Sequence, residues 1–349
     1  MLISREALHL ELPALQLLET PILCHELAML GLPVDAVEPR DGDTILDVDV
    51  TANRGDALSH WGICRDLAAR LGEPLGGRPA GCFLPTGEGP LAIRLESEAC
   101  TRYATALIDL GRMGAPPIEA ARFLERLGSS PKGLAPVDAS NELLHRYGHP
   151  THAFDADTLV GDVAVRWARV GEYLTTLDGV TRTLETTDLV IADERGPIAL
   201  AGLMGGDATK VTEATRRVLL ESAYFDPRVV RAMSRRHGLF TDASLRFGRG
   251  ADPGMADIAR DLLAQRLVSW SEGNIAALWT VGKGPGEPAP ILFRQALLTR
   301  IAGEPIAWEE AGRALAALGC QCHPEGERVL RVVPPAWRHD LVIPEDLAE

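Results

Sequence analysis

A carboxylate at the end of an apolar run is the feature that most constrains how this chain can fold. Glu221 closes the segment RRVLLES (216–222), and this run predicts a buried strand with Glu221 at its inner end. Burying an unpaired carboxylate costs free energy, so we expect Glu221 to have a partner. Upstream, Gly205 and Gly206 end another apolar run. They predict either a tight turn between two strands or a backbone that a ligand can approach closely.

An arginine-rich stretch follows this run. Between Arg228 and Gly250 there are six arginines and one acidic residue, Asp242, although the whole chain has a net charge of -14. A local basic cluster in an acidic protein favours a phosphate-bearing partner. The alternatives are a solvated surface or internal ion pairs. The cluster consists of Arg228, Arg231, Arg235, Arg236, Arg246 and Arg249.

The composition of the 349 residues, 46% hydrophobic and 24% charged, is typical of a soluble globular protein with two or three domains. The chain has neither an apolar run of about 18 residues nor a signal-peptide pattern, so we expect a cytoplasmic protein without a membrane span. Six cysteines without a CxxC pair predict mostly reduced thiols. Cys320, Cys322 and His323 suit either a metal site or a strand with one buried face. No metal or cofactor is expected.

Periodicity predicts an α+β protein with several domains. Helical spacing over 7–32 and an alternating strand at 44–51 precede a turn in which Arg54 and Asp56 are expected to pair. A strand-rich region with a few helices then extends to about residue 275. The order helix, turn, helix, hairpin after a Gly- and Pro-rich linker predicts a small helix-turn-helix-like domain. Its glutamates make it a poor DNA reader, so we expect a packing or partner module.

Three histidines lie around a break in the pattern at residues 148–150. His145 precedes this break and His149 lies within it, so their spacing does not predict a metal-binding face. His152 follows a Pro-Thr turn and is better placed to point into a cavity. The alternative for His152 is a core histidine with satisfied hydrogen bonds.

Five segments together resemble the beta subunit of bacterial phenylalanyl-tRNA synthetase. They are DVDVTANRGDALSHWGICRDLAARLGEPL, PTHAFDADTL, LAGLMGGDATKVTEATRRVLLESAYFDP, TDASLRFGRGADP and VVPPAWRHDLVIPEDLAE. The resemblance implies an N-terminal domain at 1–84 without the oligonucleotide-binding insertion, a tRNA-editing-type domain at 85–282 and a DNA-binding-fold-like domain at 288–349. In this family the middle domain hydrolyses tyrosine wrongly attached to the tRNA for phenylalanine.

The resemblance also implies roles for single residues. Catalysis falls on His152 in the HAFD motif, on Thr241 and on Asn141, the last in a turn that precedes His152. Recognition of the amino acid falls on Glu221, Gly205, Gly206 and Ala243. The arginine cluster is expected to bind the 3′ end of tRNA. The chain departs from the family at Gly248, where RFGRG replaces RFERG and removes a charge.

Two classes of function remain open. One is a hydrolase that clears mischarged tRNA in trans. The other is a non-catalytic paralogue or fragment that binds tRNA, a synthetase subunit or a second copy of itself. Aminoacylation is not expected, because the chain contains no GxxxxGK[ST] motif and nothing that resembles a class II core. No contact with DNA or a membrane is expected either.

Overall fold

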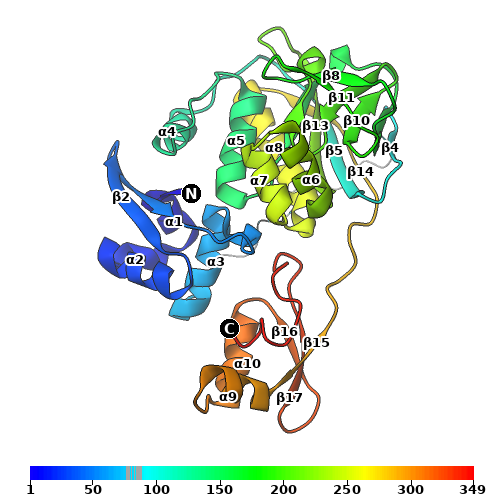
Figure 1. The fold of residues 1–349 in the computed structure, drawn as a ribbon. Coiled ribbons are helices and arrows are strands. Elements are labelled where there is room, and N and C mark those ends of the chain that lie inside the picture. Colours follow the sequence, from blue (N-terminus) through cyan, green and yellow to red (C-terminus); the bar gives the residue numbers. More distant parts are fainter. Residues whose placement is uncertain (76–78, 80, 82, 84–88) are drawn as a thin grey trace. The chain divides into compact units, whose positions relative to one another are not determined.

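A computed structural model describes residues 1–75, 79, 81, 83 and 89–349. The chain forms two compact units, one from residues 1–39, 43–76 and 286–349 and the other from residues 40–42 and 77–285 (Figure 1). The mixture of helices and sheets confirms the expected α+β class. The boundary expected between residues 84 and 85 lies outside the described residues. Among those described, no helix is long and apolar enough to cross a membrane.

The N-terminal part of the first unit has a small sheet covered by helices. Its strands lie in the order β1-β3-β2, and β2 and β3 are joined by the turn at Asp41 and Gly42, both with positive φ. Ser59 caps α3 by accepting a hydrogen bond from Gly62 N, and Gly72 ends it. The elements are β1 (Leu2–Ser4), α1 (Arg5–Glu11), η1 (Pro13–Leu17), α2 (Thr20–Met29), β2 (Val34–Arg40), β3 (Asp43–Val48), η2 (Gly55–Ala57) and α3 (His60–Leu71).

The pairing expected in the turn before α3 is confirmed. The Arg54 guanidinium donates to Asp56 Oδ1 over 2.9 Å and to Oδ2 over 3.0 Å, and it also donates to Asp66. All three side chains are largely buried, so this cluster fixes the start of α3 against its own second turn. The turn is therefore structural.

The C-terminal part of the first unit has the predicted two helices and hairpin. It also has a strand at residues 291–294, where the sequence pattern predicts the start of a helix. Ile291 and Phe293 are both buried and pair with Val332 and Leu330, which makes this segment an edge of the sheet β15-β17-β16. The elements are β15 (Ile291–Arg294), α9 (Gln295–Ala302), α10 (Trp308–Ala317), β16 (Gln321–Pro324) and β17 (Val329–Val333).

Cys322 and His323 lie in strand β16, and Cys320 is buried just before it. Burial raises the pKa of the Cys320 thiol to about 11. Within the part of the chain that the structure describes, no group of three or more potential ligands is placed to hold a metal ion. These residues therefore belong to a partly buried strand edge, which was one of the two expectations.

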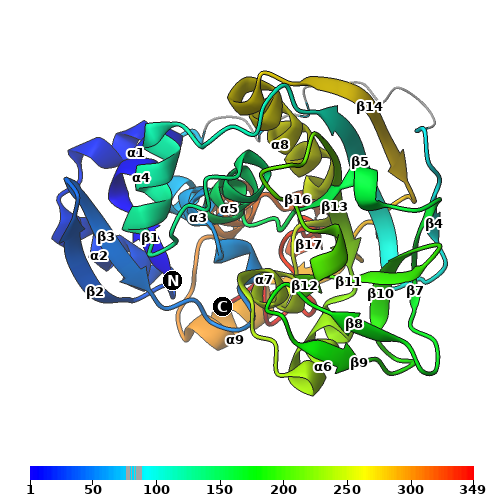
Figure 2. The same ribbon diagram turned by 90° about the horizontal axis from the view of Figure 1, so that it is seen from above.

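A four-stranded antiparallel sheet forms the centre of the second unit. Its order is β14-β5-β13-β6. Two helices, α5 and α8, cover one face of it, where Leu143 and Leu267 pack against Val218 and Leu220 (Figures 1 and 2). The elements are β5 (Cys100–Asp109), α5 (Ala135–Tyr147), β6 (His152–Asp155), β13 (Arg217–Phe225), α8 (Ala256–Ser271) and β14 (Asn274–Val281).

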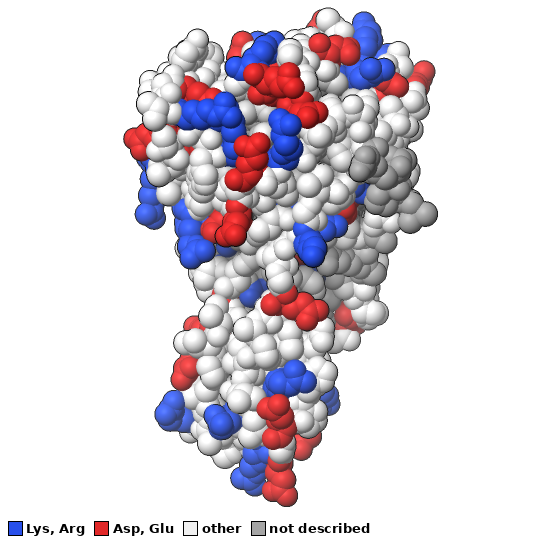
Figure 3. Space-filling view, turned by 90° about the vertical axis from the view of Figure 1, so that its right-hand side faces the viewer, with Lys and Arg blue, Asp and Glu red and all other residues white. Residues whose placement is uncertain are grey.

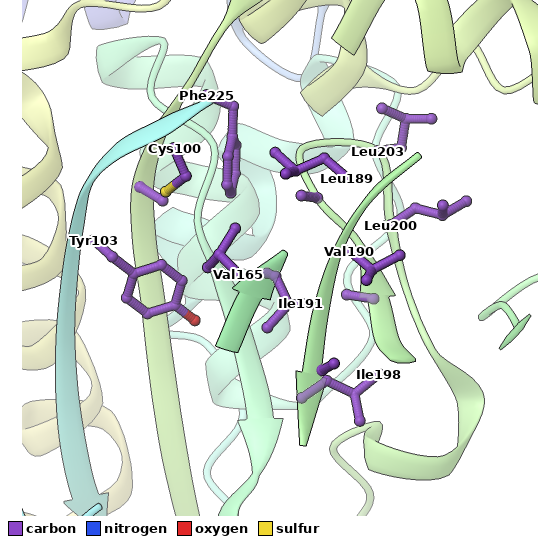
Figure 4. Close-up of a cluster of buried hydrophobic side chains, with 14 of the residues drawn as sticks. Cys100, Tyr103, Val165, Leu189, Val190, Ile191, Ile198, Leu200, Leu203 and Phe225 are labelled. Carbon is purple, nitrogen blue, oxygen red and sulfur yellow. The ribbon is translucent and has the colours of Figure 1, made fainter. Parts of the chain in front are cut away.

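The other face of this sheet packs against a five-stranded sheet of order β12-β11-β10-β7-β4. Figure 4 shows part of the apolar core between the two, where Phe225 and Tyr103 face Val165, Leu189 and Ile191. The strands are β4 (Ile93–Leu95), β7 (Val163–Trp167), β10 (Leu189–Asp193), β11 (Gly196–Leu200) and β12 (Met204–Gly205), and a separate hairpin joins β8 (Tyr173–Thr175) to β9 (Thr181–Thr183).

Two short helices, α6 and α7, close one end of this core with Val230, Met233 and Phe247. Gly238 ends α6 with a φ of 62° and lets the chain turn into α7. The remaining elements of the unit are α4 (Ile118–Arg126), η3 (Ala156–Thr158), η4 (Asp207–Thr209), α6 (Pro227–His237), α7 (Asp242–Arg249) and η5 (Pro253–Met255).

Candidate functional site

Glu221 and His152 are direct neighbours on two paired strands. In the antiparallel register of β13 and β6 they lie opposite each other, and Glu221 also lies opposite Thr105 of β5. Directly opposed residues point to the same face of a sheet. Phe154, two residues after His152, belongs to the core between the two sheets, so the Glu221 and His152 side chains face that layer.

The structure corrects the expected position of Glu221 within its strand. The prediction put Glu221 at the inner end, but β13 continues to Phe225 and pairs with β5 beyond Glu221. A polar residue, Ser222, directly after the carboxylate is what makes the sequence predict the end of the strand there. Ser222 is in fact buried, as strand alternation places it on the opposite face.

The expectation that Glu221 has a partner is also wrong for the described residues. The side chain is only 6% exposed, yet no hydrogen bond or opposite charge within that part of the chain offsets the burial of its carboxyl group. Burial instead raises the pKa of Glu221 to about 8. A buried carboxyl group keeps its proton when no cation compensates the charge. Glu221 is therefore mostly a neutral carboxylic acid at pH 7.

His152 is also kept neutral by burial, which lowers its pKa to about 4. Its ring meets Phe154 edge to face, with 4.6 Å between ring centroids. Its Nε2 atom is buried and has no hydrogen-bond partner among the described residues. The alternative of a core histidine with satisfied hydrogen bonds is thus not what the structure shows.

Gly205 brings a strand of the second sheet against the His152 ring. A Cβ atom on Gly205 would lie 2.5 Å from His152 Cε1 and 2.7 Å from Nε2, closer than real Cβ contacts. Only glycine allows this approach of backbone to imidazole. The Gly205 carbonyl accepts a hydrogen bond from Leu177 N over 3.0 Å, so the residue also anchors the loop after β8.

Gly206 has a different role from Gly205. Its amide donates to Ile198 O over 2.7 Å, and a Cβ there would lie 2.6 Å from the same oxygen. The amide is thus used within the sheet. The tight turn between β11 and β12 is at Gly202, where φ is +71°, and not at the glycine pair.

Thr241 is the N-cap of α7. Its hydroxyl accepts a hydrogen bond from Ser244 N and donates to Leu203 O, both over 3.0 Å. Leu203 lies in the turn between β11 and β12, so the cap ties the start of α7, including Ala243 in its first turn, to the strand that carries Gly205. The single hydroxyl proton of Thr241 is already engaged.

Asn141 lies in the middle of α5, and not in a turn as the resemblance implied. The helix continues because Gly148, rather than the Asn141 region, supplies the left-handed residue that ends it. His145, one turn further on, has its pKa lowered to about 4 by burial and by the nearby Arg246 of α7. Residues four apart share one side of a helix, so Asn141 lies on the α5 side that faces α7.

Two members of the arginine cluster, one buried and one exposed, form ion pairs within the fold. Arg246 is 2% exposed and bonds Asp242 Oδ1 over 2.8 Å. Arg236 pairs with the fully buried Asp188 and with Glu185. These two guanidinium groups hold α7 and the end of α6 in place. Arg246 is too buried to lie on a phosphate-binding surface, whereas Arg236 is exposed and its contact with tRNA stays a prediction.

The remaining arginines are accessible to different degrees. Arg228 is exposed and pairs with Asp226, and Arg231 is exposed and donates to Gly248 O. Arg249 is partly exposed. Arg235 is exposed, and no hydrogen bond or ion pair of its side chain occurs among the described residues. On the face of the molecule in Figure 3, basic and acidic side chains are interspersed and form no continuous basic surface.

Two polar side chains near Glu221 were not found from the sequence. Tyr103 Oη and Trp279 Nε1 are buried and have no hydrogen-bond partner in the described part of the chain. Trp279 lies opposite Thr105, so the register places Trp279, Thr105, Glu221 and His152 in one row across the sheet. Only the strand register reveals this row, since the four strands are far apart in sequence.

Comparison with known proteins identifies two domains. The B3/4 domain family matches residues 99–271, and the tRNA synthetase B5 domain family matches residues 291–349. A solved structure, an N-terminal fragment of the phenylalanyl-tRNA synthetase beta subunit from Pyrococcus horikoshii, covers 100% of this chain with a TM-score of 0.52. The chain in turn covers 97% of that fragment at 14% identity, which shows a shared fold.

Curated relatives agree with these domains. The phenylalanine--tRNA ligase beta subunit of Anaeromyxobacter dehalogenans is 41% identical over 91% of this chain and 40% of its own length. The beta subunit of Thiobacillus denitrificans is 39% identical over 92% of this chain and 42% of its own length. The chain thus spans about two-fifths of the length of these relatives. It is a homologue of the phenylalanine--tRNA ligase beta subunit in which a B3/4 domain is followed by a B5 domain.

Proposed function

We propose that this chain hydrolyses mischarged aminoacyl-tRNA, with tyrosine attached to the tRNA for phenylalanine as its substrate, and that it acts on tRNA charged elsewhere. The observation that carries the proposal is the cross-strand pair of Glu221 and His152 with the Gly205 backbone against the imidazole. The buried His152 Nε2 atom has no hydrogen-bond partner among the described residues, and no neighbouring charge or hydrogen bond offsets the burial of the Glu221 carboxyl group, as expected of groups reserved for a ligand.

Recognition of the amino acid is assigned to Glu221. A neutral carboxylic acid both donates and accepts hydrogen bonds, and so does the phenol group of tyrosine. Phenylalanine lacks this group and would leave the buried carboxyl group without a partner. Sites built to bind a substrate hydroxyl reject the analogue that lacks it by about 10⁴ to 10⁵. Glu221 is thus suited to release tyrosine and spare phenylalanine.

The chemistry is assigned to a water molecule held by His152. With a pKa of about 4 the imidazole is neutral near pH 7, so a ring nitrogen can accept a hydrogen bond from water. The water oxygen attacks the ester carbonyl carbon, the bond from that carbon to the ribose oxygen breaks, and the ribose oxygen takes up a proton. A base of such low pKa removes a proton weakly, so its main contribution is to orient the water.

A second candidate is a homologue that binds tRNA, a synthetase subunit or another copy of the chain without catalysis. One observation favours it. The Thr241 hydroxyl was expected to act in catalysis and Gly206 in recognition of the amino acid, but the hydroxyl and the Gly206 amide already donate to Leu203 O and Ile198 O. Fewer donors then remain for the oxyanion that forms during ester hydrolysis.

A deacylation assay tests the proposal. The purified protein is incubated with the tRNA for phenylalanine carrying tyrosine or phenylalanine, and with other charged tRNAs. We expect release of tyrosine above the buffer rate. His152→Ala should slow release of every substrate by about 10²-fold, because the attacking water is no longer positioned. Glu221→Ala should slow release of tyrosine far more than that of an amino acid without the hydroxyl.

The exposed His25 provides a control for the histidine substitution, since His25→Ala should leave all rates unchanged. If the wild-type protein releases no amino acid but retains charged tRNA on a filter, the binding function replaces the hydrolase. Equal loss across substrates in Glu221→Ala would instead give the carboxyl group a role in the fold or the chemistry.

A further inference from the structure

Tyr103 carries a buried hydroxyl group that forms no hydrogen bond with the described residues. The residue lies in β5 and is 0% exposed, and its Oη atom has no hydrogen-bond partner in the described ranges. Burying a hydroxyl without a partner destabilises a protein, whereas phenylalanine would fill the same space without that cost. A tyrosine in this position therefore indicates that a bound ligand supplies the hydrogen-bond partner of the oxygen atom.

The strand register places this hydroxyl beside the Glu221 and His152 pair. Tyr103 lies opposite Ala223, and Thr105 lies opposite Glu221, so Tyr103 and Glu221 are diagonal neighbours on one face of the sheet. Diagonal neighbours are about 7–8 Å apart at their backbones, within reach of an aromatic side chain. Ala223 is small and leaves space for the ring to extend over β13.

The direction of the ring agrees with this placement. Figure 4 shows Tyr103 extending from β5 into the layer between the two sheets, toward Val165 and Ile191. Burial raises the pKa of the Tyr103 hydroxyl, and the neighbouring Glu221 raises it further, which is consistent with their proximity. Trp279 Nε1 also lacks a partner among the described residues, but its strand is separated from β13 by β5. Tyr103 is thus the nearer donor.

We infer that Tyr103 is a specificity residue, and that its hydroxyl and the Glu221 carboxyl group together bind the side-chain hydroxyl of a tyrosine substrate. The inference rests on the proposed function and adds a second contact to it. The substrate hydroxyl donates to a Glu221 oxygen and accepts a hydrogen bond from Tyr103 Oη, so both of its hydrogen-bonding capacities are used. The Tyr103 hydroxyl and the Glu221 carboxyl group thereby both gain a hydrogen bond.

The test replaces only the oxygen atom, with Tyr103→Phe, and measures two activities. The first is release of tyrosine and of phenylalanine from the tRNA for phenylalanine. The second is binding of L-tyrosine methyl ester and L-phenylalanine methyl ester to the free protein. We expect tyrosine release and tyrosine ester binding to fall about fivefold to tenfold, the effect of one lost hydrogen bond. Phenylalanine release and binding of the phenylalanine ester should not change.

A stability measurement separates recognition from a structural role. In the absence of ligand, Tyr103→Phe should melt at the same temperature as the wild-type protein or higher, because it removes an unpartnered buried hydroxyl. Tyr173→Phe is the matched control, since Tyr173 is 69% exposed, and it should change neither activity nor melting. A lower melting temperature with equal losses for both esters would overturn the inference.

The two activities distinguish failure of the inference from failure of the proposed function. If the wild-type protein releases tyrosine and Tyr103→Phe keeps the full preference for tyrosine, the inference is wrong and the hydrolase stands. If the wild-type protein releases neither amino acid, the proposed hydrolase function is wrong, and binding of the two esters tests the role of Tyr103. Weaker binding of only the tyrosine ester then supports the role of Tyr103, and no binding of that ester to the wild-type protein overturns it.

Discussion

Gly205 and His152 are in such close contact that no side chain fits between them, since a Cβ atom on Gly205 would lie 2.5 Å from the imidazole Cε1. Gly205→Ala should therefore displace the ring, at a cost of about 1–3 kcal/mol in the free energy of unfolding. Because the displaced imidazole no longer positions the water, we expect deacylation to fall further than stability explains. Rates measured well below the melting temperature separate the two effects.

Gly312→Ala is a control for the Gly205 substitution. Gly312 lies in α10 without a positive φ, and a Cβ there would meet only Leu330 Cδ1 at 3.7 Å, an ordinary contact. It should preserve the deacylation rate. Full activity in Gly205→Ala would show that the close approach matters for packing alone.

The raised pKa of Glu221 predicts a loss of stability with rising pH. The folded pKa is about 8 and the ordinary value is 4.5, so the folded state holds the proton more tightly and is favoured at low pH. His152 has the opposite shift, from 6.5 to about 4, and destabilises the fold only as the pH falls below 6.5. Of these two groups, Glu221 should therefore make the larger contribution to the change in the free energy of unfolding between pH 6.5 and 8.

Glu221→Gln isolates this effect, because the amide resembles the protonated acid and does not ionise. From pH 6.5 to 8 the wild-type free energy of unfolding should fall by roughly 2 kcal/mol relative to that of the variant. Urea unfolding at several pH values provides the measurement. Parallel pH profiles for the two proteins would mean that Glu221 is ionised in the folded state and has a partner.

Two adjacent arginines should respond differently to substitution. Arg235 is exposed, so Arg235→Ala should weaken tRNA binding and reduce the slope of log affinity against log salt by about 1, without changing stability. Arg236 pairs with the buried Asp188, so Arg236→Ala should cost about 1.5–3 kcal/mol of stability. Filter binding across a salt series and thermal unfolding test both. An unchanged salt slope in Arg235→Ala removes this arginine from the RNA contact.

Gly248 differs from the family motif and should tolerate a side chain. It lies in α7 without a positive φ, and a Cβ there would be 3.1 Å from Cγ of Arg231, whose flexible side chain can move. Gly248→Ala should stabilise the protein by about 0.4–1 kcal/mol, because the unfolded chain loses freedom. Gly250→Ala, at a φ of +101°, should destabilise it instead. Denaturant unfolding compares them, and a loss in both would show that α7 is too tightly packed for the substitution.

Local sequence signals determined most helices and several turns of this protein. Periodicity predicted helices within residues 7–32 and a strand at 44–51, where α1, α2 and β3 lie, and the pairing of Arg54 with Asp56 followed from two residues two positions apart. Each of these depends on residues close together in the chain. The edge strand β15 was missed because four residues beside a helix carry little periodicity, and its pairing with β17 decides its conformation.

The candidate site was only partly determined by the sequence. Motif resemblance pointed to Glu221, His152 and Gly205, but only the tertiary structure placed them against one another, through the register of β13 with β6 and the packing of a second sheet. Sequence reasoning also expected a partner for Glu221 and a contact with tRNA for Arg246, which is buried and paired with Asp242. Whether a charge is paired, neutralised or exposed depends on which distant segments bury it, and that is set by the fold rather than by neighbouring residues.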